Sequence, residues 1–294
     1  MTLSDGLVQR KKTNNTTEYD DFSVNSHNPE EHTNLNDKFD KCWSMTLMEQ
    51  IMLLGLKDFE NIYRVQGHTS FWNDYISPAL RGCILVELCF RKRIRLAPNM
   101  GIRKKSLLRR HVELVDSRST GEVLLDEALR HIKELSDLGE FHNTEYWVEL
   151  LSGETWNPLR LKYQLKNLRE RILKQLTEKG VLGTEKQSFV LFDVVTHPVA
   201  DGSSKKALVS LLQSSLLSKW QNDLRRFDKR VLSLVYLAHS ADVLDPVLDL
   251  LSDETYNLAM KHISKLLDVN FENEAVQEPE FEVMWAVFDV FSTR

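Results

Sequence analysis

One segment, PALRGCILVELCFRK at residues 78–92, is apolar on most sides when it is wound as a helix. A helix without a polar face cannot lie at a surface, so other elements have to cover it. Ser77 is the expected cap, and Pro78 suits the first helical turn because its ring already holds a helical φ. The segment therefore predicts a central helix with other helices packed around it.

Two capping boxes mark helix starts elsewhere. Thr46 with Glu49, and Ser119 with Glu122, have the spacing at which a hydroxyl and a carboxylate satisfy free amides at a helix start. Helical patterns follow both, and the sequence thus predicts a mainly helical protein. Further helical patterns cover residues 144–151, 205–251, 253–267 and 281–291.

The most regular helical pattern begins after Asn157 and Pro158 and ends at Gly180, the expected left-handed cap. One stripe of this predicted helix is apolar, and a second stripe beside it carries cations that share a face. The apolar stripe consists of Leu161, Leu165, Leu168, Ile172 and Leu176, and the basic stripe of Lys162, Lys166 and Arg169.

A β-prone stretch follows this helix. Val181 and Leu182 precede a polar, turn-like stretch at residues 184–188, and Phe189–Phe192 is a compact apolar run. The pattern predicts a β-hairpin whose second strand, residues 189–192, is apolar on both faces.

The first 42 residues are rich in Asn, Asp, Glu, Thr and Ser and predict a disordered tail, so the folded domain is expected at residues 43–294. The tail contains a cationic cluster, Arg10-Lys11-Lys12, which is either a solvated cluster or a short docking motif. Three cysteines favour a reducing, cytosolic compartment. The sequence has no apolar run of membrane-spanning length and no apolar leader, so contact with a membrane is expected through the folded surface.

Charge is distributed unevenly along the chain. The net charge is −5, yet residues 91–110 contain nine Lys/Arg and no Asp/Glu, whereas residues 239–289 contain twelve Asp/Glu and two Lys. A mildly acidic chain with this layout can present a basic face to anionic partners.

Motifs of enzyme chemistry are missing from the sequence. There is no Gly-rich phosphate loop, nucleophile elbow or paired-cysteine zinc spacing, and His197 and His239 stand alone. The sequence therefore predicts a protein that is not an enzyme and that has no cofactor or metal.

Trp72 stands in the polar loop HTSFWNDYIS, nine residues before Arg81. Taken alone, a tryptophan of this kind is more often partly buried than functional, a basic stripe is more often a solvated face, and an apolar hairpin is more often core. Together they indicate membrane contact, because tryptophan favours the membrane–water interface and Lys and Arg bind phosphate groups.

At these positions the sequence resembles the Golgi phosphoprotein 3 family. The resemblance covers residues 43–293 and implies a mainly α, single globular domain built around a central helical bundle, with surrounding amphipathic helices and one protruding β-hairpin. It also implies a peripheral membrane protein of the cytosolic face of the Golgi, at the trans-Golgi, that exchanges with the cytosol. It rests on the segments GHTSFWNDYISPALRGCILVEL, GIRKKSLLRR, TGEVLLDEAL, ELLSGETWNPLRLKYQLKNLRERI, LTEKGVLGTEKQSFVLFDVVTHP and YLAHSADVL.

The function that this resemblance implies is that of an adaptor. It would recognise phosphatidylinositol 4-phosphate and link the cytosolic tails of Golgi glycosyltransferases to coatomer, for retention and retrograde vesicle trafficking. The family's headgroup pocket corresponds here to Trp72, Arg81, Lys166 and Arg169. Lysine at 166 replaces the arginine common in animals, which keeps the charge but loses the bidentate fork.

The resemblance also implies roles for two further segments. Membrane insertion and self-association are implied for the hairpin from Glu185 to Thr196, with Phe189, Val190, Leu191 and Phe192 as its apolar tip. Coatomer contact is implied for Arg10, Lys11 and Lys12.

Two other functions compete with this interpretation. A nucleic-acid-binding protein would use the basic run at 91–110, but no recognisable reading helix accompanies it, so no nucleic acid is expected among the partners. A hydrolase or transferase acting at the Golgi would need a deep pocket lined with carboxylates or histidine.

Overall fold

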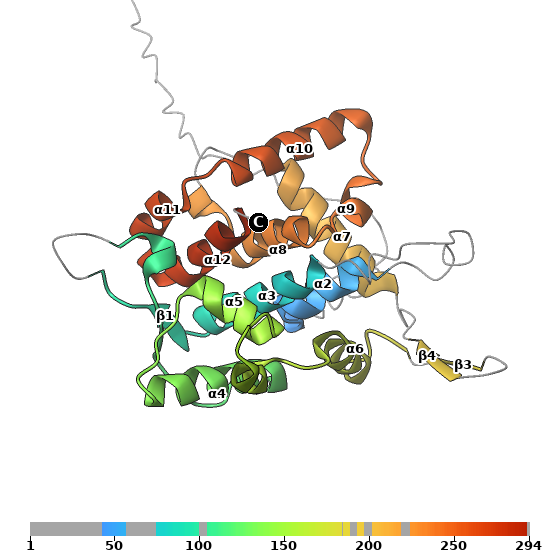
Figure 1. Cartoon of the computed structure of the whole chain (residues 1–294). Helices are drawn as coiled ribbons and strands as arrows, with labels where there is room; N and C mark the ends of the chain where they lie inside the picture. The colour runs from blue at the N-terminus through green and yellow to red at the C-terminus, as the bar shows by residue number, and fades with distance from the viewer. Residues whose placement is uncertain are drawn as a thin grey trace, which may run out of the picture.

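The computed structural model describes residues 43–56, 75–99, 105–183, 185–188, 193–196, 202–218 and 224–292 (Figure 1). Several predicted features lie outside these residues: the tail with Arg10, Lys11 and Lys12, the loop with Trp72, the hairpin tip at residues 189–192, and His197.

Helices dominate the described part of the chain, as predicted. The α-helices are α2 (Leu47–Gly55), α3 (Ile76–Phe90), α4 (Val123–Asp137), α5 (Thr144–Ser152), α6 (Leu168–Glu178), α7 (Gly202–Leu217), α8 (Lys229–Ser240), α9 (Asp245–Leu248), α10 (Asp253–Leu267), α11 (Phe271–Gln277) and α12 (Glu282–Ser292). The 3-10 helices are η3 (Leu107–Arg109), η4 (Pro158–Tyr163), η5 (Leu224–Arg226) and η6 (Pro279–Phe281).

Helix α3 lies at the centre of the fold, which confirms the prediction for residues 78–92. It packs against α2, α4, α5, α8 and α12, and nearly all of its residues from Ile76 to Cys89 are buried (Figure 1). Because α3 is apolar around its circumference, each neighbour covers a different side of it. One hydrophobic core joins α3 to all of these helices, so the domain is single.

Local capping predictions had mixed outcomes. The Thr46–Glu49 capping box at the start of α2 is present, and both of its hydrogen bonds form. The Ser119–Glu122 box is wrong, because α4 begins at Val123 and the hydroxyls of Ser119 and Thr120 donate instead to the Asp126 carboxylate. The Ser77 cap is wrong too, because α3 already begins at Ile76.

The predicted continuous helix from 158 to 180 is also wrong. The structure divides it into η4 and α6, separated by residues 164–167, and Asn167 adopts a left-handed conformation with φ of 51°. Gly180 does follow α6 with a positive φ of 67°, as predicted. Because of this break, Lys162 lies in η4, apart from Lys166 and Arg169 at the start of α6.

Four short strands form two antiparallel pairs. β1 (Ile94–Leu96) pairs with β2 (Val112–Leu114), which was not predicted. β3 (Glu185–Ser188) pairs with β4 (Asp193–Thr196), so the hairpin is confirmed, but its strands lie on either side of residues 189–192 instead of including them. This register agrees with the hairpin that the family resemblance implies.

The helices of the described residues are all too short or too polar to cross a membrane.

Candidate anion-binding site

A short loop between α5 and α6 is closed at its base by direct hydrogen bonds. The amide of Leu165 donates to the carbonyl oxygen of Leu151 (3.0 Å), and the side-chain amide of Gln164 donates to the carbonyl oxygen of Ser152 (3.1 Å). Gly153 makes this turn possible with a φ of +84°, a conformation that only glycine adopts without strain. We call residues 152–164 the α5–α6 loop and the Leu151–Leu165 contact its neck.

Arg81 lies beneath the neck. Its side chain leaves α3, and its Nε donates to the carbonyl oxygen of Leu151 (3.3 Å) while its Nη2 donates to that of Leu165 (3.2 Å). Nη1 donates to the carbonyl and hydroxyl oxygens of Ser77, at 2.9 and 2.6 Å. A single guanidinium therefore ties the central helix to both sides of the neck.

The charge of Arg81 has no carboxylate partner among the described residues. The residue is only 5% exposed, and its acceptors are neutral carbonyl and hydroxyl oxygens. Burial and, next, the nearby positive charge of Arg169 lower the pKa of Arg81 to about 10, while the charge of Glu154 acts in the opposite direction. Buried charges are normally paired, so a guanidinium in this state favours an anion nearby.

Arg110 is the informative contrast. It is as deeply buried as Arg81, at 7% exposure, but both of its terminal nitrogens donate to the Glu282 carboxylate at 2.6 Å. Among the described residues, a carboxylate thus pairs with Arg110 and none pairs with Arg81.

Lys166 and Arg169 lie on the α6 side of the neck. Lys166 is exposed in the turn before the helix, and Arg169 is half-buried in the first turn of α6, close enough for its charge to act on Arg81. Among the described residues no ion pair joins Lys166. The site therefore gathers three cations from two separate parts of the chain, and the carboxylate of Glu154 is close enough for its charge to act on Arg81.

The third cation of the predicted stripe does not belong to this cluster. Lys162 lies in η4, where its Nζ donates to Glu134 at 2.6 Å and sits 4.6 Å from the Tyr163 ring centre. The helix break at residues 164–167 removes it from the face of Lys166 and Arg169, so the prediction of one basic stripe on one helix is wrong.

Comparison with known proteins identifies the family. The family model described as Golgi phosphoprotein 3 (GPP34) matches residues 47–283. The chain belongs to the Golgi phosphoprotein 3 family. It is also 42% identical over 232 residues to "Vacuolar protein sorting-associated protein 74" of Schizosaccharomyces pombe (strain 972 / ATCC 24843), a match that spans 76% of this chain and 66% of that protein's length.

Of the four headgroup residues that the Golgi phosphoprotein 3 resemblance implies, the structure brings Arg81 and Arg169 together and places Lys166 beside them. Trp72 lies outside the described residues. Sequence reasoning missed Gly153 and Asn167, which shape the neck and the break. The residue type could have identified both positions in the sequence, since Gly and Asn are the residues that most readily adopt a positive φ.

Several cations of the basic run at 91–110 form internal ion pairs. Arg93 pairs with Asp116, Arg95 with Glu113 at 3.2 Å, and Arg110 with Glu282. A solvated nucleic-acid-binding face needs free cations, so these pairs weigh against the nucleic-acid alternative.

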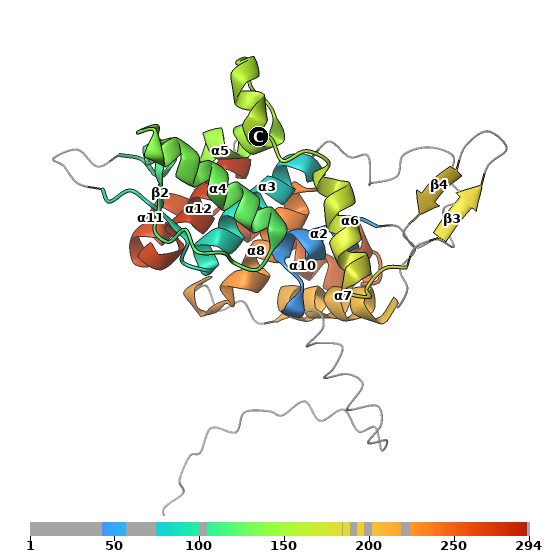
Figure 2. The same ribbon diagram turned by 90° about the horizontal axis from the view of Figure 1, so that it is seen from below.

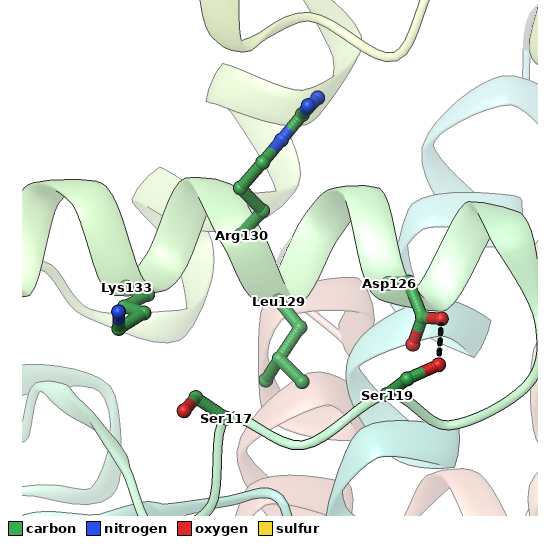
Figure 3. A pocket seen from close by; sticks show the side chains of 6 residues that line it. All are labelled: Ser117, Ser119, Asp126, Leu129, Arg130 and Lys133. Atoms are coloured by element: carbon green, nitrogen blue, oxygen red, sulfur yellow. Dashed lines mark hydrogen bonds between the residues drawn. The ribbon is translucent and has the colours of Figure 1, made fainter.

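A small cavity beside α4 gives the enzyme alternative little support. It has a volume of about 230 Å³ and is lined by Ser117, Ser119, Asp126, Leu129, Arg130 and Lys133 (Figure 3). Burial raises the pKa of Asp126, but hydrogen bonds from Ser119 and Thr120 outweigh it and hold the pKa below its ordinary value. This carboxylate is already satisfied, and the described residues contain no His/Cys/Asp/Glu group that could hold a metal.

Proposed function

We propose that the chain is a peripheral membrane adaptor that binds phosphatidylinositol 4-phosphate at the cytosolic face of the Golgi. The observation that carries the proposal is the buried charge of Arg81, which forms an ion pair with no carboxylate of the described residues and has Arg169 close by. An anion at the neck would relieve both the desolvation of Arg81 and its repulsion by Arg169. Membership of the Golgi phosphoprotein 3 family supports the choice of this lipid.

Each cation has its own role in the proposal. Lys166 and Arg169 are exposed enough to contact the phosphates directly, and the guanidinium of Arg169 can do so with two parallel hydrogen bonds. Arg81 acts from below, where it fixes the neck and adds a buried positive charge. Trp72 is proposed to lie at the lipid interface beside this site.

Vesicle co-sedimentation tests the headgroup site. Lys166→Ala and Arg169→Ala should each weaken binding to vesicles that contain phosphatidylinositol 4-phosphate by about fivefold or more, because each basic residue near an anionic surface contributes about 1 kcal/mol. Lys174→Ala is the matched control, since Lys174 lies on the same helix and pairs with Glu178 at 3.8 Å. Equal binding by all three variants contradicts the site.

The adaptor role of the proposal uses other surfaces. The hairpin of β3 and β4 is proposed to insert into the membrane and to mediate self-association, and Arg10-Lys11-Lys12 to contact coatomer while the domain holds glycosyltransferase tails. Replacing Leu191 and Phe192 with Asp should reduce monolayer insertion, self-association or both. Unchanged insertion and self-association would contradict the proposed role of the hairpin.

Replacing Arg10, Lys11 and Lys12 with Ala should reduce coatomer capture without changing lipid binding. Unchanged coatomer capture would contradict the proposed role of this cluster.

A further inference from the structure

The α5–α6 loop carries large apolar side chains on its outer side. Trp156 is fully exposed at 104%, Leu159 is 80% exposed and Leu161 is 40% exposed. Isolated exposed leucines are ordinary, but a tryptophan that no neighbour covers, with a leucine three residues away, forms an apolar point on the surface. In Figure 2 this yellow-green segment stands out from the helical body between α5 and α6.

The loop is held in this shape from within. Tyr163 is buried to 2% exposure and donates its hydroxyl to Glu134 (3.2 Å), while Arg160 pairs with Glu140. The Asn157 side chain accepts the Leu159 amide at 3.0 Å and fixes the turn that η4 begins. With its neck closed and its inner side anchored on α4, the loop presents Trp156 and Leu159 outward as part of the folded state.

The apolar point lies next to the cation cluster. The neck that Arg81 closes is the base of this loop, and Lys166 follows it directly. Lys166 and Arg169 lie at this base, and Arg81 adds a buried positive charge beneath it. An apolar tip with cations at its base matches an anionic bilayer, whose headgroups are negative and whose acyl region is apolar.

We propose that η4, together with Trp156 just before it, forms a membrane anchor distinct from the hairpin, which we call the η4 anchor. Trp156 and Leu159 insert into the headgroup–acyl boundary of the same bilayer that the cation cluster binds. This inference rests on the proposed function, since the cluster orients the loop toward the lipid. A protein partner is the weaker choice, because a stable protein interface buries about 800 Å² on each side and a projecting tip of two side chains supplies far less.

Site-specific labelling tests where Leu159 goes. Cys83 and Cys89 are buried, and burial raises the pKa of Cys89 to about 11, so neither competes for a thiol label. In a Cys42→Ser background, Leu159→Cys carries the environment-sensitive fluorophore NBD. Val276→Cys, on the exposed face of α11 at 68% exposure, is the matched control.

Vesicles of phosphatidylcholine with phosphatidylinositol 4-phosphate should raise and blue-shift the NBD emission at position 159, and brominated acyl chains should quench it. The label at position 276 should not respond. The response at 159 should persist in the Leu191→Asp/Phe192→Asp variant wherever that variant still sediments with the vesicles.

Loss of binding gives a second readout. Trp156→Ser/Leu159→Ser should weaken vesicle binding roughly tenfold, as expected for partial burial of one large and one medium apolar side chain. Leu250→Ser/Val276→Ser removes two exposed apolar side chains elsewhere on the surface, at 76% and 68% exposure, and should leave binding unchanged.

The outcomes separate the two proposals. Normal vesicle binding with no change at position 159 overturns the η4 anchor and leaves the headgroup site standing. A change at 159 that needs no vesicles and grows with protein concentration also overturns the anchor, because it shows that a second copy covers the tip. Failure to bind any vesicle overturns both.

Discussion

At the residue scale, Arg81 combines two functions that proteins usually divide between residues. It fixes the backbone, through the carbonyl oxygens of Leu151 and Leu165, and it places a positive charge beneath the surface. The family resemblance identified Arg81 as a site residue from sequence, but the residue type alone could not reveal that its donors face inward. That property depends on two carbonyl groups 70 and 84 residues away.

Replacing Arg81 with Lys isolates its geometric role. The variant keeps the charge but cannot reach both sides of the neck, so buried carbonyl oxygens lose donors and the free energy of unfolding should fall by about 1–3 kcal/mol. Urea denaturation measures the change. Arg130→Lys, on an exposed arginine of α4, should leave the midpoint in place, and an equally stable Arg81→Lys protein contradicts the clamp.

Replacing Lys166 with Arg should increase the affinity for the lipid instead of lowering stability. Lys166→Arg restores a guanidinium fork next to Arg169, so the affinity for phosphatidylinositol 4-phosphate vesicles should rise by about twofold to tenfold, because a bidentate phosphate contact becomes possible. Vesicle titration at constant salt measures it, with Lys174→Arg as control. Unchanged or weaker binding would indicate that Lys166 does not touch the phosphate.

At the element scale, the break between η4 and α6 explains the main error of sequence reasoning. Leu161, Leu165, Leu168, Ile172 and Leu176 keep helical spacing across the break, although Leu161 is 40% exposed while the other four are buried. Apolar periodicity indicates which residues face a core. It does not reveal a single residue in the left-handed conformation, such as Asn167, which directly precedes α6. The helices α2, α3 and α10 lack such a residue, and their patterns predicted them well.

Gly153 permits a sharp test of the closed loop. A Cβ at this position would lie 2.5 Å from Gln164 side-chain atoms, so Gly153→Ala should both strain the backbone and displace Gln164 from the neck. We expect a loss of about 1–2 kcal/mol from the left-handed φ alone, with added loss of hydrogen-exchange protection at the amide of Leu165.

Gly139 supplies the matched control. It has a similar φ of +75°, but a Cβ added there would have no neighbouring atom within 4 Å. Gly139→Ala should show the backbone strain without the change at Leu165. If the two variants have the same exchange pattern, the Gln164 contact does not hold the neck.

At the scale of the whole molecule, two of the carboxy-terminal helices lie on the side opposite to the proposed membrane-binding residues. Helices α10 and α11, from the acidic carboxy-terminal third, lie across the body from α4 and α6 (Figure 1). The sequence predicted the central helix, because an apolar circumference is a property of a long segment. It also allowed a basic face at the run 91–110, but Arg110 of this run pairs with Glu282 of α12, in the acidic carboxy-terminal third. The sequence could not show this pair, since its partners come from distant elements.

Stability should depend on pH through three histidines, of which His131 is buried. Burial lowers the pKa of His131 from its ordinary value of 6.5, with a partly opposing effect from Glu127, and burial likewise lowers the pKa of His142 and His239. Below pH 6.5 the unfolded chain therefore binds protons that the folded chain binds less readily. The free energy of unfolding should fall as the pH drops from about 6.5 toward 5.

His131→Phe tests this dependence. The ring of His131 meets that of Tyr163 edge-on at 5.4 Å, a contact that phenylalanine can preserve. Urea denaturation at several pH values should show a shallower decline for the variant than for the wild type. Identical slopes would assign the pH dependence to other groups.

The closed neck has a consequence for kinetics. A flexible loop of this length loses conformational entropy when a ligand draws its ends together, and that cost slows or weakens capture. Here folding has already closed the loop, so encounter with a membrane requires no rearrangement of it. We expect association to be limited by diffusion, and residence time to be set by the number of lipid contacts that must be broken, which suits a protein that samples membranes repeatedly instead of remaining on one.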